Sequence, residues 1–153
     1  MTTKEYLSQV SSLERRIRTQ KDEIDMLREL SVSVSIRYDG ERVQTSGCHD
    51  SLASAVIHIQ EEEDKLADMI KKYLEVKEII KNQIFRMDNP LYSDLLFEKY
   101  VVGLSFIKMQ ETMNYSRRQL IRLHGVALLE FEKKYKYSFK EFMREQCEEN
   151  CEI

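Results

Sequence analysis

The sequence is poor in the residues that break regular structure. Its 153 residues include one proline and four glycines, so few positions force a helix to end. A fold with many strands would need many more turn residues between them. Lys, Glu and Arg are abundant, charged residues make up 33% of the chain, and these types suit exposed helix surfaces. We therefore expect an all-α fold.

Several functional classes lack their usual signals. No stretch approaches the roughly 18 consecutive apolar residues of a membrane span, and the N-terminus has no signal-peptide core. The cysteines Cys48, Cys147 and Cys151 are odd in number and indicate free thiols in a reducing compartment. They have no second cluster at the spacing of a zinc site, and no phosphate-binding loop or nucleophile motif occurs. We expect a cytoplasmic protein that is not an enzyme and needs no cofactor, metal or membrane.

Two apolar stripes with alternating spacings of four and three residues predict a helical coiled-coil stalk over residues 1–88. A two-helix hairpin of this length buries little apolar surface by itself, so we expect a homodimer through the stalk. The polar interruptions in the second stripe, Glu63 and Lys77, either fix the register or lie beyond the partner helix. The stripes consist of Tyr6, Val10, Leu13, Ile17, Gln20, Ile24 and Leu27, and of Leu52, Val56, Ile59, Glu63, Leu66, Ile70, Tyr73, Lys77, Ile80 and Ile84.

The segment 31–50 between the stripes carries a mixed signal. Valine and isoleucine alternate with serine over 32–36, and Asp39–Gly40 follows, which is typical of a β-hairpin turn. A short hairpin at the tip of the stalk and an irregular loop are both compatible with this pattern. We favour the loop.

The only proline marks the start of a second region, 89–137, for which we predict short helices followed by an acidic tail over 138–153. Asn89 can cap a helix whose first residue is Pro90. That helix should run to about residue 101, where Gly103 provides a left-handed end. Ser105 can then cap the next helix, residues 106–113.

A helix-turn-helix follows from the next residues. Asn114 tolerates the left-handed conformation of a tight turn, and Ser116 with Gln119 forms a capping box for a third helix over 116–131. Apolar residues recur where two steeply crossing helices touch: Met109, Met113, Tyr115, Leu120 and Leu123. The opposite side of the third helix carries Arg117, Arg118, Ile121 and Arg122.

These arginines give the third helix the character of a DNA-recognition helix. Arginine offers a planar fork for guanine or phosphate, and Ile121 can contact a thymine methyl group. Residues 86–144 also carry an excess of Lys and Arg, whereas 1–85 and 145–153 carry an excess of Asp and Glu. Positive charge at a helix N-terminus opposes the helix dipole, so an incoming phosphate explains the arrangement better than local stability does.

Residues 90–131 resemble the C-terminal, promoter-reading domain (region four) of bacterial sigma factors. The resemblance lies in Leu-Leu-Phe-Glu-Lys-Tyr-Val-Val-Gly-Leu-Ser (95–105) and Met-Asn-Tyr-Ser-Arg-Arg-Gln-Leu-Ile-Arg-Leu-His-Gly-Val-Ala-Leu (113–128). The whole chain, including Val-Gln-Thr-Ser (43–46), is similar to small phage proteins grouped with ArpU-type late-operon transcriptional regulators. Gln110 and Asn114 depart from the small residue and the glycine that are common in such motifs, and the other core elements of a sigma factor are absent.

The resemblance implies a phage or prophage transcriptional regulator in a bacterial host, which binds double-stranded DNA sequence-specifically; host RNA polymerase is a further candidate partner. The resemblance places the DNA contacts at Arg117, Arg118, Ile121 and Arg122. Ser116 at the start of the helix is a further candidate contact, and Lys133 and Lys134 are candidates for a backbone extension of that surface. Two alternatives remain open: a phage packaging adaptor of the small-terminase type, and a structural coiled-coil oligomer with subsidiary DNA contact. The basic domain docking on polymerase with only weak DNA contact is a third hypothesis.

Overall fold

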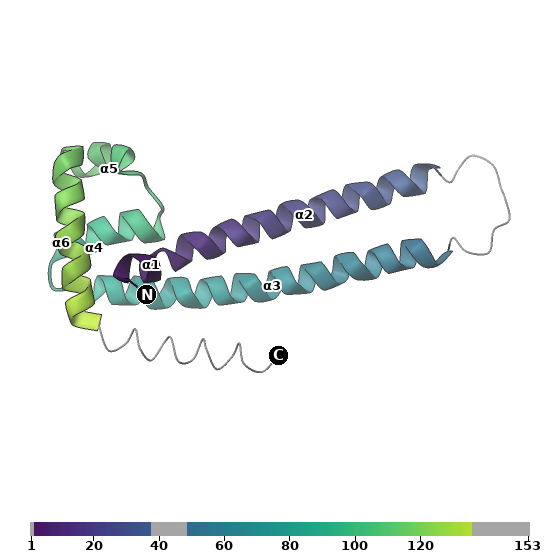
Figure 1. The fold of residues 1–153 in the computed structure, drawn as a ribbon, viewed down its shortest axis with the longest axis horizontal. Coiled ribbons are helices and arrows are strands. Elements are labelled where there is room, and N and C mark those ends of the chain that lie inside the picture. The colour runs from purple at the N-terminus through teal and green to yellow at the C-terminus, as the bar shows by residue number, and fades with distance from the viewer. Residues whose placement is uncertain (1, 38–48, 136–153) are drawn as a thin grey trace. The chain divides into compact units, whose positions relative to one another are not determined.

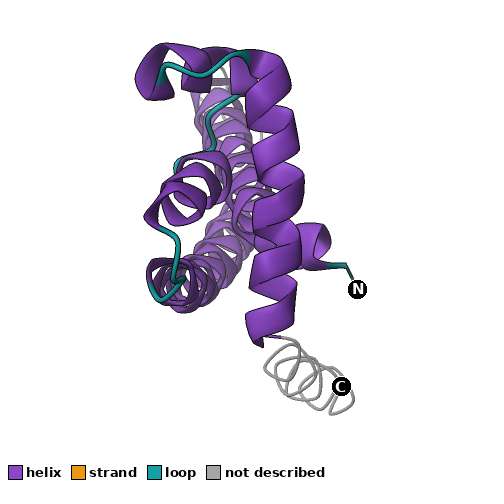
Figure 2. Ribbon diagram, turned by 90° about the vertical axis from the view of Figure 1, so that its left-hand side faces the viewer, coloured by secondary structure: helices purple, strands orange, loops and turns teal. Residues whose placement is uncertain are grey.

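The computed structural model describes residues 2–37 and 49–135, and it confirms the all-α prediction over them. These residues form helices joined by short turns, with no strand among them (Figures 1 and 2). The predicted acidic tail 138–153 and the three cysteines lie outside the described residues. The elements are α1 (Thr3–Leu7), α2 (Gln9–Arg37), α3 (His49–Phe85), α4 (Pro90–Leu96), the π-helical turn η1 (Phe97–Val101), α5 (Phe106–Met113) and α6 (Arg117–Tyr135).

Residues 31–37 are helical, so neither the hairpin nor the favoured loop is correct for them. α2 continues through this segment to Arg37. Extending an existing helix adds one hydrogen bond for each residue fixed, and a β-branched residue lowers helix stability by less than about 0.7 kcal/mol. The alternation of valine and isoleucine with serine was therefore too weak a signal to stop the helix. Asp39–Gly40 lies outside the described residues.

The chain divides into two compact units that differ from the predicted stalk and C-terminal domain. One unit comprises Ser12–Glu75, and the other comprises Met1–Ser11 together with Val76–Ile153. The predicted boundary lay between residues 88 and 89, whereas in this division both ends of the predicted stalk belong to the unit that contains the predicted C-terminal domain. Tyr6, Leu7 and Val10 are buried in that unit. Periodicity alone did not reveal this, because the apolar stripes continue without a break into the second core.

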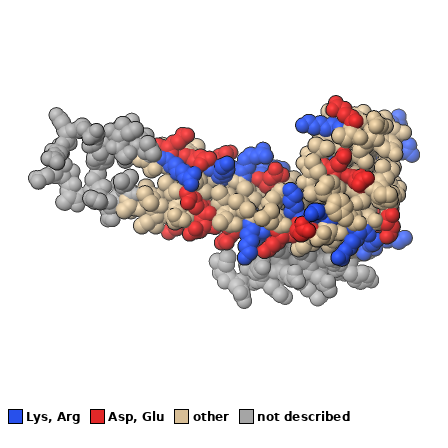
Figure 3. All heavy atoms as spheres, turned by 180° about the vertical axis from the view of Figure 1, so that it is seen from behind, with Lys and Arg blue, Asp and Glu red and all other residues tan. Residues whose placement is uncertain are grey.

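In the unit Ser12–Glu75, α2 and α3 lie side by side and antiparallel (Figure 1). Side chains of both signs are interspersed along the face that Figure 3 shows, as on a solvated helix pair. Ile24 of the first predicted stripe is 2% exposed. The positions of the second stripe differ in burial: Ile59, Leu66 and Tyr73 are half-buried, whereas Val56 and Ile70 are exposed.

Two polar contacts join the helices of this unit. Gln20 Nε2 donates a hydrogen bond of 2.7 Å to Glu62 Oε2, and Arg28 pairs with Glu63. Glu62, Glu63 and Met69 share the inner side of α3 with Leu66, whereas Ile70 is exposed. In this unit the predicted stripe thus matches the inner side at Ile59, Glu63, Leu66 and Tyr73 and departs from it at Val56 and Ile70.

The second unit contains the larger core. α4, α5 and α1 each pack against α6, and Figure 2 shows α4 and α5 beside α6. Ring contacts connect Phe131 of α6 with Tyr6 at 6.4 Å and with Tyr135 at 4.8 Å between centroids. Tyr135 Oη also donates to the carbonyl oxygen of Gln83. The buried apolar residues of this unit are Tyr6, Leu7, Val10, Val76, Ile80, Ile84, Met87, Leu95, Leu96, Tyr100, Val101, Met109, Leu120, Ala127 and Phe131.

Local signals determine how the helices of this unit begin and end. Asn89 accepts a hydrogen bond from the amide of Leu91, with Pro90 in the first turn of α4, as predicted. Val102 N donates to Phe97 O at 3.1 Å, which widens the last turn into η1. Gly103 has a φ of 82° and ends the helix there. The sequence reasoning also missed a capping box at Thr2 and Glu5 that starts α1.

His124 lies half-buried in the second unit. Its ring stacks on Tyr100 at 5.7 Å and meets the edge of Phe106 at 5.4 Å, and Tyr100 Oη lies 3.0 Å from His124 Nε2. Burial, followed by the charges of Lys99 and Lys4, lowers the pKa of His124 below its ordinary value of 6.5. Burial also raises the pKa of Tyr100 to about 12. His124 is therefore neutral in the folded protein near neutral pH.

This lowered pKa makes stability depend on pH. Below the ordinary histidine pKa the unfolded chain binds a proton that the folded chain does not, so the free energy of unfolding falls as the pH drops from about 6.5. We expect the melting temperature to fall further between pH 7.5 and pH 5.5 in the wild type than in His124→Gln. An equal fall of the melting temperature in the two proteins would contradict this account.

Candidate nucleic-acid interface

α5, a three-residue turn and α6 form a helix-turn-helix whose local geometry follows the predicted signals. Asn114 has a φ of 56° and ends α5 in the left-handed conformation. Gln119 N donates to Ser116 Oγ at 3.3 Å, and Ser116 N donates to Gln119 Oε1 at 3.0 Å, which completes the capping box. α6 begins at Arg117 and extends to Tyr135, four residues beyond the predicted end.

Packing fixes which side of α6 faces inward. Leu120, Ala127 and Phe131 are fully buried, and Met109 of α5 is buried with them. Figure 1 shows α5 lying across the N-terminal end of α6. The predicted contact residues Met113, Tyr115 and Leu123 are half-buried. Because successive residues turn about 100° around a helix, this inner row leaves a defined outer row on the opposite side.

The predicted DNA-facing side chains lie on this outer row, except Arg117, which is the first residue of the helix. Arg117, Arg118 and Arg122 are exposed, and Ile121 is 49% exposed. Within residues 2–37 and 49–135, no carboxylate forms an ion pair with any of these arginines. Three guanidinium groups therefore stand within the first two turns of α6 without a neutralising partner in the described part of the chain.

The two predicted lysines behave differently from each other. Lys133 is exposed, whereas Lys134 Nζ lies 2.7 Å from Asp88 Oδ1 and donates to the carbonyl oxygen of Arg86 at 2.6 Å. The hydrogen bond with Asp88 raises the pKa of Lys134 above its ordinary value. Lys134 thus joins the C-terminal end of α6 to the end of α3 within one unit. We leave it out of the candidate interface.

Ser116, a predicted DNA contact, forms part of the cap of α6. Its Oγ accepts from the amide of Gln119 and donates to Gln119 Oε1 at 2.8 Å. The hydroxyl group therefore holds the start of α6 in place. The residue remains exposed at the end of the helix that carries the arginines.

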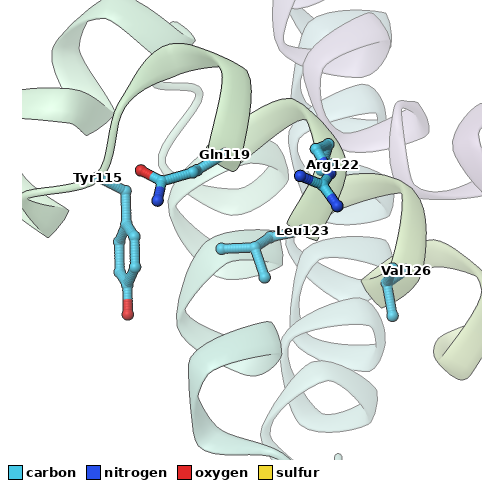
Figure 4. A pocket seen from close by; sticks show the side chains of 5 residues that line it. All are labelled: Tyr115, Gln119, Arg122, Leu123 and Val126. Atoms are coloured by element: carbon cyan, nitrogen blue, oxygen red, sulfur yellow. The ribbon is translucent and has the colours of Figure 1, made fainter.

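A shallow groove beside the arginines was not predicted. It has a volume of about 300 Å³ and is lined by Tyr115, Gln119, Arg122, Leu123 and Val126 (Figure 4). Tyr115 comes from the turn, and the other four residues follow one side of α6. The spacing of 119, 122, 123 and 126 is the signal that would have revealed this side, but it overlaps the stripe assigned to the core.

The described residues show neither a metal site nor a membrane-spanning helix. They contain no group of three or more His, Cys, Asp and Glu side chains arranged to hold a metal ion. None of the described helices has both the length and the apolar character needed to cross a membrane. The comparisons with family models, curated proteins and solved structures find no match to the chain.

The turn residue gives a direct test of the local geometry. An alanine at 114 would have to adopt a left-handed conformation that disfavours any Cβ, whereas glycine adopts it without strain. We expect Asn114→Ala to lower the free energy of unfolding by about 1 kcal/mol and Asn114→Gly to leave it equal or higher. Denaturant titration followed by circular dichroism measures both; equal destabilisation by the two substitutions would contradict the assignment.

Proposed function

We propose that the protein binds double-stranded DNA with the N-terminal half of α6 in the major groove and regulates transcription. The observation that carries the proposal is the exposed set Arg117, Arg118 and Arg122, which has no ion pair in the described part of the chain and stands at the start of a helix whose other side is buried. Such a helix presents its first turns to base edges and phosphates.

Local stability gives no reason for this arrangement. The N-terminus of a helix carries a partial positive charge, and three arginines there are electrostatically unfavourable. α6 has no acidic residue in its first turn to offset them. Phosphate groups of a duplex would supply the missing negative charge, and counterion release would add to the affinity.

The side chains of the outer row have complementary roles. Arg118 and Arg122 are one turn apart, so they reach neighbouring positions along a groove. Each offers a planar pair of donors that matches guanine or a phosphate. The exposed Ile121 between them supplies apolar surface for a thymine methyl group.

Self-association through the unit Ser12–Glu75 is the second part of the proposal. Among the residues of that unit whose side chains the structure describes, Ile24 is the one buried apolar residue. Val56, Ile70 and Leu74 lie along one flank of α3 and are 58%, 40% and 57% exposed. A second copy covering this flank would bury apolar surface that the helix pair leaves in water, and it would match the two-fold symmetry of many operators.

The biological setting rests on the resemblance of residues 90–131 to a promoter-reading domain. It supports a phage or prophage regulator acting in the cytoplasm of a bacterial host. Contact with host RNA polymerase belongs to the same proposal. The packaging adaptor differs from the regulator in its expected oligomeric state.

DNA binding is tested with a fluorescent random-sequence duplex titrated at several salt concentrations. We expect Arg118→Ala and Arg122→Ala each to weaken binding and to reduce the slope of log affinity against log salt by about 0.9 for every phosphate that is no longer neutralised. Arg16→Ala, an exposed arginine of α2, is the matched control and should change neither quantity. An unchanged affinity and slope in both α6 variants would overturn the proposal.

Oligomeric state is tested by light scattering on the purified chain. We expect the mass of a dimer, and we expect Ile70→Glu combined with Leu74→Glu to yield a monomer, because two carboxylates would enter the apolar flank. Ala53→Glu, an exposed position of the same helix, is the control and should remain dimeric. A large closed ring would favour the packaging adaptor instead.

A further inference from the structure

Gly125 is an unexplained residue of α6. It lies in the interior of a 19-residue helix, where glycine is among the least favourable residues. A Cβ built at this position meets no atom within 4 Å, and its φ is not in the left-handed range. Neither backbone conformation nor packing in the described residues therefore requires a glycine here.

The position of Gly125 relates it to the arginines. Arg118 lies seven residues before it, which is nearly two complete turns, so the two residues fall on almost the same line along the helix. Ile121 and Arg122 lie on the turn between them, and all three neighbours are exposed. Gly125 thus continues the outer row by one turn.

We infer that Gly125 is a positioning residue for DNA, one that allows the axis of α6 to approach the duplex closely. This inference rests on the proposed DNA binding. A side chain at 125 would stand between the helix backbone and the groove wall, whereas its absence lets the turn rest directly against sugar and phosphate atoms. The arginines on the preceding turns then reach the base edges at a shorter distance.

The surroundings of Gly125 favour a duplex over a protein helix as the approaching surface. The preceding turns of the same row carry positive charge without a neutralising carboxylate in the described part of the chain. An apolar surface also continues beyond Gly125, with Val126 47% and Leu129 67% exposed. A protein partner would use that apolar end, and the experiment separates this outcome from DNA contact.

The test compares duplex affinity with thermal stability in the full chain. Gly125→Ala should raise the melting temperature by roughly 2–4 °C, because alanine is the better helix former, yet it should weaken duplex binding. Gly125→Leu should weaken binding by about tenfold or more, since a larger side chain forces the helix away from the groove. Ala53→Leu enlarges an exposed side chain of α3, in the other unit, and should keep wild-type affinity.

Each outcome is decisive. Weaker binding by the Gly125 variants, with intact folding by circular dichroism and an unaffected Ala53→Leu, supports the inference. Unchanged affinity in Gly125→Ala and Gly125→Leu, while Arg118→Ala binds weakly, overturns the role of Gly125 and leaves the DNA proposal intact. A change in oligomeric mass with unchanged duplex affinity overturns it in favour of a protein surface. Failure of the wild type to bind any duplex overturns both proposals.

Discussion

The burial of one side of α6 is the constraint on which the candidate interface depends. Leu120, Ala127 and Phe131 are each fully buried, and they fix the rotation of the helix about its own axis. Helical geometry then determines that Arg118 and Arg122 face outward. A different rotation of this one helix would bury guanidinium groups at a large desolvation penalty. The apolar inner row and the charged outer row are therefore two consequences of one packing arrangement.

Features set by a few neighbouring residues could be predicted from the sequence. Asn114 and the Ser116–Gln119 capping box satisfy backbone groups within one turn, so their geometry depends little on the rest of the chain. Lys134 could not be assigned in this way, because its partner Asp88 is 46 residues away. The same reason explains why Tyr6 was placed in a stalk: its contact with Phe131 exists only after the chain has folded back.

The stripe on α3 shows the limit of a periodic pattern. A repeat of four and three residues averages 3.5 residues per turn, whereas a straight helix has about 3.6, so an assigned stripe drifts around the helix. Glu62 and Glu63 are adjacent in sequence, and both reach the other helix, where Gln20 donates to Glu62 and Arg28 pairs with Glu63. A carboxylate is tolerated beside Leu66 because the hydrogen bond from Gln20 is available.

The outer row of α6 is where local preference and the actual residues disagree. Arginines at 117 and 118 oppose the helix dipole, and glycine at 125 lowers helix propensity without relieving any contact in the described residues. Elsewhere in α6, the cap at Ser116, the buried inner row and the contacts of Lys134 all favour the observed helix. In sequences that fold well, helix propensity, capping and packing favour the same structure, and departures from this agreement are concentrated at functional sites. Two unfavourable features of different physical kinds meet on one side of one helix. A single external surface that is negatively charged and approaches closely would account for both, and a nucleic-acid duplex has these two properties.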